Sequence, residues 1–83
     1  MKVFTNHTDW VVARDLADVK TIIEGHYGST FEEEGWTLAE WREVPDDEHI
    51  RIDDFDGHGN VASFTAKHWI ERDGRGLLCS TEY

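Results

Sequence analysis

The sequence predicts a single α+β domain with two helices packed on one face of an antiparallel sheet, in the order ββαβββαβ. Its length of 83 residues is that of one domain. Short runs of apolar and β-branched residues recur between turn residues, which is typical of antiparallel strands. Two other segments carry apolar residues at helical spacing, each preceded by a capping residue and followed by glycine. Strands and helices in this arrangement favour an α+β architecture.

The first two predicted strands form a hairpin. Residues 2–5 alternate around Val3 and Phe4, and residues 10–13 are aromatic and β-branched. Residues 6–9 between them are rich in turn-forming side chains.

The first helix is predicted over 16–26. Asp15 is placed to cap it, because its carboxylate can accept the free backbone N–H groups of the first turn. Asp18 adds negative charge near the positive end of the helix dipole. Gly25 and Gly28 are two alternative ends.

Residues 29–40 are ambiguous in pattern. Glu32–Glu34 predicts a solvated loop or a short helical turn, and Thr37–Glu40 matches a capping box. Because Pro45 stops any helix soon after, we expect a short turn at 37–40 followed by a strand at 41–44.

Three strands are predicted to form a meander over 41–64. Residues 45–48 and 54–60 are turn-forming, and the strand 49–53 between them alternates apolar and polar residues. A further strand is expected over 61–64.

The second helix is predicted to begin at the Thr65 cap and to end at Gly74. Phe64 and Trp69 are spaced for a hydrophobic staple. A final strand is expected over 76–80.

The net charge of −10 limits the classes of partner. It disfavours direct binding to nucleic acid or to an anionic membrane, because phosphate contacts need Lys and Arg. Any charged partner is expected to be basic. The sequence shows no apolar run of transmembrane length and no signal-peptide pattern, and its single cysteine fits a reducing compartment. We therefore expect a cytoplasmic protein that does not bind a membrane.

Nearly all of this charge lies in the middle of the chain. Between Glu32 and Asp56 there are eleven acidic residues against two arginines, so this segment carries −9 of the −10. The candidate binding residues are the acidic clusters of the segment: Glu32, Glu33, Glu34, Asp46, Asp47, Glu48, Asp53, Asp54 and Asp56. Three interpretations remain open: a solvated face that provides solubility, a surface complementary to a basic partner, and a cation site.

No pattern indicates a catalytic centre, a metal site or a cofactor. A calcium loop beginning at Asp54 fails because position 5 is His58 and position 12 is Thr65, where a bidentate Glu is needed. His68 and Glu71 have a metal-ligand spacing on a helix but lack partners of the same kind. Cys79 lies in an apolar strand, where a thiol is usually a small buried hydrophobe.

The C-terminal third resembles a group of known proteins. The segments Thr65–Trp69 and Gly74–Tyr83 (T-A-x-x-W followed by G-R-G-L-L-C-S-T-E-Y) are similar to the ending of small phage- and prophage-encoded acidic proteins of unassigned function. Residues 10–13 and 44–47 add to the resemblance, which covers about half of the chain. It implies a mobile-element origin and transfers no catalytic residues. Small acidic phage proteins often bind a host protein, as anti-restriction and anti-CRISPR inhibitors do.

We therefore expect a non-enzymatic interaction protein, one form of which is an inhibitor that imitates the charge of nucleic acid and covers a basic, nucleic-acid-binding surface of a host protein. A small metal-binding module or metal-dependent enzyme is the first alternative. A structural or oligomer-forming domain is the second, and the sequence does not predict an oligomeric state.

Overall fold

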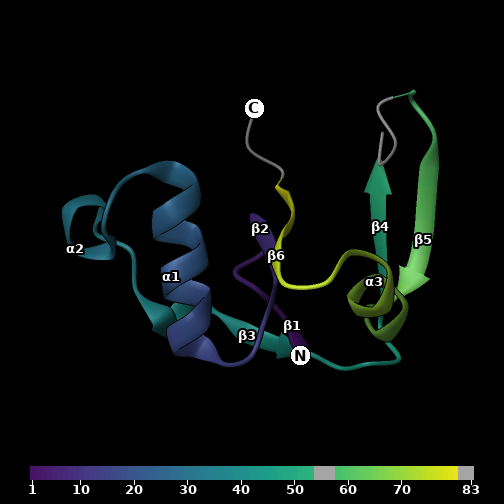
Figure 1. Ribbon diagram of the computed structural model, residues 1–83, viewed down its shortest axis with the longest axis horizontal. Helices are drawn as coiled ribbons and strands as arrows, with labels where there is room; N and C mark the ends of the chain where they lie inside the picture. Colours follow the sequence, from purple (N-terminus) through teal and green to yellow (C-terminus); the bar gives the residue numbers. More distant parts are fainter. Residues whose placement is uncertain (54–57, 81–83) are drawn as a thin grey trace.

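The structure is a computed structural model that describes residues 1–53 and 58–80. It confirms the α+β class and the predicted order of strands and long helices. Of the two alternatives for Glu32–Glu34 it shows the helical one, and it shows a 3-10 turn within the turn expected at 37–40. The molecule measures 35 × 25 × 18 Å along its three principal axes. Figure 1 shows it with the longest axis horizontal.

The described strands form two antiparallel sheets. The larger sheet contains, in spatial order, β3 (Arg42–Val44), β1 (Lys2–Thr5), β2 (Asp9–Ala13) and β6 (Gly76–Ser80). The smaller is a hairpin of β4 (His49–Asp53) and β5 (Val61–Thr65). The helical elements are α1 (Leu16–Tyr27), α2 (Phe31–Glu34), the 3-10 turn η1 (Leu38–Glu40) and α3 (Ala66–Asp73). None of the helices in the described residues has the length and apolar character needed to cross a bilayer.

The central hairpin of the larger sheet is apolar on both faces. Val3 lies opposite Val12, and Phe4 lies opposite Val11. Because successive side chains of a strand point to opposite faces, the valine pair lies on one face and the Phe4–Val11 pair on the other. All four side chains are buried. Each face of this sheet therefore needs its own cover.

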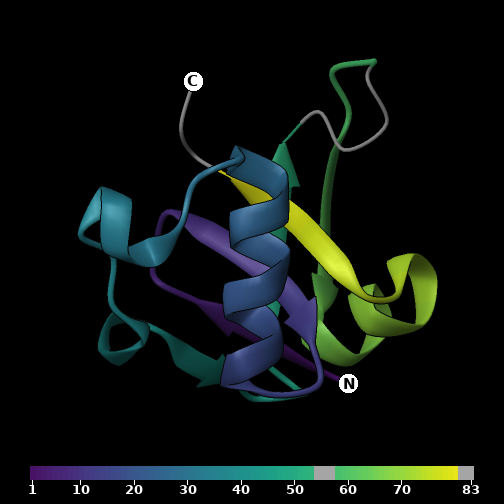
Figure 2. The ribbon, with the colours of Figure 1, turned by 60° about the vertical axis from the view of Figure 1, so that its left-hand side comes forward.

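Helix α1 covers the face that carries Phe4 and Val11. Val19 and Ile23 of α1 pack there, together with Trp41. In Figure 2, α1 crosses in front of the strands of the larger sheet. Burial of this apolar surface is what holds the helix to the sheet.

Helix α3 and the β4–β5 hairpin cover the opposite face. Trp69 of α3 is fully buried beside Val3 and Val12, and its indole N–H donates a 2.9 Å hydrogen bond to the backbone carbonyl of Ile50 in β4. Phe64 contacts Trp69 with ring centroids 5.0 Å apart, as the predicted staple requires.

The two longer helices thus lie on opposite faces of the sheet, which corrects the expectation that both pack on one face. The reason lies in β1 and β2, whose apolar residues occupy consecutive rather than alternate positions. A strand of that kind is buried on both sides.

The predicted meander over 41–64 is wrong at its first strand. β3 pairs with β1, with Val44 opposite Val3, and among the described residues β4 pairs only with β5. The turn after Pro45 carries the chain to the other face, where the backbone carbonyl of Glu48 accepts the first N–H of α3. The predicted turn at 54–60 includes residues 54–57, which lie outside the described residues.

Most of the predicted helix ends are confirmed. Asp15 accepts the backbone N–H of Asp18 at 2.8 Å, and Thr65 accepts that of His68 at 3.2 Å. Of the two glycines proposed to end the first helix, Gly28 does so, with a φ of 72°. The capping box at Thr37 is not formed, because that side chain makes no capping hydrogen bond.

Asp18 has a larger role than its predicted contribution to the helix dipole. Its side chain is only 3% exposed, and Arg75, which directly precedes β6, donates to it at 2.6 Å. The backbone N–H and the guanidinium of Arg14 donate to the same carboxylate. These hydrogen bonds, with that of Arg75 first, hold the pKa of Asp18 well below its ordinary value of 3.8. Asp18 thus ties the start of α1 to the last strand.

Candidate functional site

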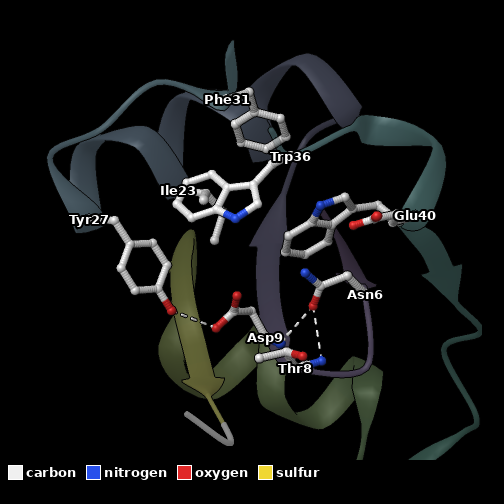
Figure 3. Close-up of a pocket in the computed structure, with 9 residues that line it drawn as sticks. Asn6, Thr8, Asp9, Ile23, Tyr27, Phe31, Trp36 and Glu40 are labelled. Carbon is white, nitrogen blue, oxygen red and sulfur yellow. Dashed lines mark hydrogen bonds between the residues drawn. The ribbon is translucent and has the colours of Figure 1, made fainter. Parts of the chain in front are cut away.

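A pocket of about 180 Å³ opens at the end of the molecule where α2 lies. Four elements build it: the turn between β1 and β2, the C-terminal half of α1, α2, and the segment that runs through η1 toward β3. In Figure 3, Phe31 and Trp36 lie above the pocket, Tyr27 and Glu40 lie on either side, and Asp9 and Asn6 lie below.

Aromatic rings form the walls of this pocket. Tyr27 and Trp36 meet with centroids 5.5 Å apart and planes inclined at 58°, which makes a corner of two rings. Phe31 supports Trp36 edge-on at 5.6 Å. Trp41 also lines the pocket and is 7% exposed.

The position of Trp36 follows from the end of α2. Gly35 adopts the left-handed conformation with a φ of 72°, which costs glycine little. The backbone N–H of Trp36 then donates to the carbonyl of Phe31 at 3.0 Å. This is the hydrogen bond of a Schellman motif, and the Phe31–Trp36 contact is the hydrophobic pair that accompanies it.

The floor of the pocket is a buried carboxylate. Asp9 is 5% exposed, and the hydroxyl of Tyr27 donates to its Oδ1 atom at 2.8 Å. Among the described residues, no second side chain donates to this carboxylate. Figure 3 shows its other oxygen directed up into the pocket, toward Trp36.

The turn between β1 and β2 holds Asp9 in place. The side-chain carbonyl of Asn6 accepts the backbone N–H groups of Thr8 and Asp9 at 3.0 and 2.8 Å. The hydroxyl of Thr5 donates to the carbonyl of Asp9 at 2.8 Å. His7 completes the turn with a positive φ of 73°.

The sequence does not predict this pocket. Residues 6–9 have only the composition of a turn, and residues 29–40 are ambiguous in pattern. The signal that was present is the recurrence of Tyr27, Phe31, Trp36 and Trp41 beside the acidic segment. What the sequence could not show is that Asp9, eighteen residues before Tyr27, lies under these rings.

The structure separates the predicted acidic residues into three places. Glu32–Glu34 lie in α2 at one end of the longest axis, while Asp53 ends β4 toward the opposite end (Figure 1). Asp46–Glu48 lie in the turn between β3 and β4. Asp54 and Asp56 lie outside the described residues. No single compact patch therefore contains all the described members.

Some of these carboxylates have cationic partners. Glu32 lies 3.2 Å from Lys20, Glu48 lies 3.3 Å from Arg42, and Asp53 lies 3.1 Å from Arg51. A hydrogen bond from its own backbone N–H, then one from Lys20, lowers the pKa of Glu32 below its ordinary 4.5. Glu33, Glu34, Asp46 and Asp47 are exposed, and within residues 1–53 and 58–80 they make no ion pair.

The candidate metal ligands do not converge in the part of the chain that is described, where no group of three or more His, Cys, Asp or Glu side chains could hold an ion. His68 and Glu71 are both exposed on α3. The candidate calcium loop begins at Asp54, so its first ligands lie outside the described residues.

Cys79 is half-buried in β6 and lines a second hollow with Ile52 and Leu78. Burial, followed by the charge of Asp9, raises the pKa of its thiol from 9.0 to about 11. The thiol is therefore protonated at neutral pH and is a poor nucleophile there.

This protonation state predicts slow alkylation. At pH 8 the folded protein should react with iodoacetamide roughly a hundredfold more slowly than the urea-unfolded chain, because a shift of two pKa units lowers the thiolate fraction by that factor. The rate should keep rising up to about pH 11, as followed by mass spectrometry. A rate that levels off near pH 8 would contradict the raised pKa.

Comparisons with known proteins complete the description of this chain. No protein-family model, no curated protein and no solved structure matches it significantly.

Proposed function

We propose that this domain is a non-enzymatic interaction module that binds a basic surface of another protein. The observation that carries the proposal is the confinement of −9 of the −10 net charge to residues 32–56. An excess of negative charge of this size attracts a cationic surface and raises its rate of association.

The exposure of the acidic side chains supports the proposal. Four acidic side chains of the segment are exposed and have no ion pair with a described cationic side chain: Glu33, Glu34, Asp46 and Asp47. Their charges are therefore available to a basic partner. The backbone around Asp46 is nonetheless ordered, because its carbonyl accepts the N–H of Lys67 at 3.1 Å. Charges held on an ordered backbone lose less entropy when a partner binds.

The finer form of the proposal is an inhibitor of a nucleic-acid-binding protein of the host, as the resemblance to small acidic phage proteins suggests. Such an inhibitor presents carboxylates where a duplex presents phosphates. The acidic groups at α2, at the turn between β3 and β4, and at the end of β4 are spread along a molecule 35 Å long. A partner that contacts all three acidic groups must therefore cover an extended surface.

Charge reversal at two sites tests the proposal. The wild-type domain is used to capture proteins from host lysate, and the affinity of the purified captured protein is then measured between 50 and about 500 mM salt, a range over which charge screening becomes much stronger. We expect a basic partner whose affinity falls steeply with salt. Reversal to lysine of Asp46 and Asp47, or of Glu33 and Glu34, should weaken binding by about tenfold or more.

The matched control reverses Glu71 and Asp73 on α3, which lie outside the acidic segment and change the net charge equally. This variant should bind nearly as well as the wild type, and all three variants should keep the wild-type melting curve. Affinity that is independent of salt, or equal losses in all three variants, would contradict the proposal. Competition by duplex DNA tests the finer form, because a DNA mimic and DNA should exclude each other.

A further inference from the structure

We propose that the aromatic pocket binds an alkylammonium group, namely that of a lysine side chain, with or without methylation, of the partner. The identity of this ligand rests on the proposed function above. The affinity of the pocket for ammonium groups is a property of the domain alone and can be measured without the partner.

The floor of the pocket carries a buried negative charge. A carboxylate removed from water is costly unless it is paired or fully hydrogen-bonded. Asp9 is 95% removed from solvent, yet among the described side chains only Tyr27 donates to it. Its second oxygen faces the pocket interior in Figure 3. In the described residues no side-chain oxygen is both buried and without a hydrogen-bond partner, so this second oxygen of Asp9 is not a sealed, unsatisfied group. Since it faces the pocket, a cation bound there would lie beside it as a counter-charge.

The walls of the pocket have the chemistry that ammonium groups favour. Aromatic rings attract ammonium groups through the negative potential of their faces, most strongly when water is excluded. The corner formed by Tyr27 and Trp36, closed by Trp41, brings three such rings around the space above Asp9. Glu40 adds a further negative charge at the side of the pocket opposite Tyr27.

The size and shape of the pocket suit a single flexible side chain. A volume of about 180 Å³ accommodates the end of one flexible chain and is below the range of about 300–1,000 Å³ that is usual for drug-sized ligands. An arginine guanidinium is planar and favours a bidentate carboxylate partner. Because Tyr27 already occupies one oxygen of Asp9, a compact ammonium group suits this floor better.

The geometry of the pocket is largely fixed before the ligand arrives. The Asn6 side chain and the Thr5 hydroxyl hold Asp9, and the Schellman motif at Gly35 holds Trp36. A preorganised site loses little entropy on binding, so even a small cation can have measurable affinity.

Titration by nuclear magnetic resonance tests the inference. The indole N–H signals of the four tryptophans are followed while choline, butylamine or the uncharged choline isostere 3,3-dimethyl-1-butanol is added, with the ionic strength held constant. We expect the Trp36 and Trp41 signals to shift with choline or butylamine, with a dissociation constant of about a millimolar. The Trp69 signal is an internal control, because that indole lies on the opposite face of the sheet.

Two variants locate the site. Asp9→Asn keeps the shape of the floor but removes its charge, and Trp36→Ala removes one wall; each should weaken ammonium binding by about tenfold or more. Glu71→Gln removes an exposed charge on α3, away from the pocket, and should leave the affinity for ammonium compounds unchanged. Unchanged melting curves would show that the variants fold, and Trp36→Ala suits this purpose because Trp36 is only half-buried.

The outcomes separate this inference from the proposed function. If no ammonium compound binds, or if the uncharged isostere binds equally well, the inference is overturned whatever the partner does. If ammonium binds but partner affinity is independent of salt, the pocket remains and the proposed function fails. The assignment of the ammonium group to lysine is tested by comparing a lysine-containing peptide with its acetylated form, because acetylation removes the charge. Equal binding of both peptides would overturn this assignment.

Discussion

Replacing Trp69 with alanine is expected to lower the free energy of unfolding by about 3–5 kcal/mol. Trp69 is fully buried between the larger sheet and the β4–β5 hairpin, so its removal leaves a large cavity at the centre of one core. A domain of this length has a total stability of roughly 4–12 kcal/mol. Urea denaturation followed by circular dichroism should therefore show a variant that is partly or largely unfolded at 37 °C.

A more conservative replacement separates packing from hydrogen bonding. Trp69→Phe retains an aromatic ring against Val3 and Phe64 but leaves the carbonyl of Ile50 without its indole donor. It should cost less than the alanine variant, although still more than about 1 kcal/mol, because of the lost volume and the unpaired carbonyl. Alanine at Leu16, which is exposed, is the control and should stay within about 0.5 kcal/mol of the wild type. A Trp69→Ala variant as stable as this control would contradict the described core.

Replacing Asp18 with asparagine is expected to give the second large loss of stability. The substitution leaves Arg75 without the carboxylate that joins β6 to the start of α1, and it also weakens the contacts of Arg14. The loss should exceed that of Arg75→Gln, because Asp18 serves both arginines. Glu43→Gln, which breaks the exposed pair with Lys2, is the control and should have little effect.

The contribution of Asp18 should depend on pH in a defined direction. Its pKa in the folded state lies below the ordinary value of 3.8, so the ionised form stabilises the fold. This contribution is fully present above about pH 5 and is lost progressively as the pH falls through 3.8 toward the folded pKa.

The difference in melting temperature between wild type and Asp18→Asn is the measurement. It should be constant from pH 7 to about pH 5 and should then narrow as the pH is lowered to 2. A difference that stays constant across this whole range would show that the ionised carboxylate of Asp18 is not what stabilises the fold.

Local features of the fold could be predicted because they depend on neighbouring residues. Asp15 and Thr65 reach backbone N–H groups three positions ahead, and Gly28 ends α1 through its own conformational freedom. The hairpin of β1 and β2 follows from a short turn between two apolar runs. Each of these interactions joins residues that are at most eleven positions apart along the chain.

Pairings between distant segments could not be predicted in the same way. β3 pairs with β1 rather than with β4, although β4 is closer in sequence. The choice depends on which pairing buries Val44 against Val3, and the pattern of β3 alone is compatible with both. The same limit applies to Asp18 and Arg75, which are 57 positions apart.

The same distinction between short-range and long-range contacts applies to the candidate site. By itself, the sequence determined the α+β class, most of the helix caps and the confinement of acidic charge to residues 32–56, because these are properties of composition and short-range spacing. Only the tertiary structure decided that α1 and α3 cover opposite faces, that the acidic clusters lie apart, and that Asp9 lies beneath the rings of Tyr27 and Trp36. The physical reason is that burial and pairing are set by contacts between segments that only the folded chain brings together.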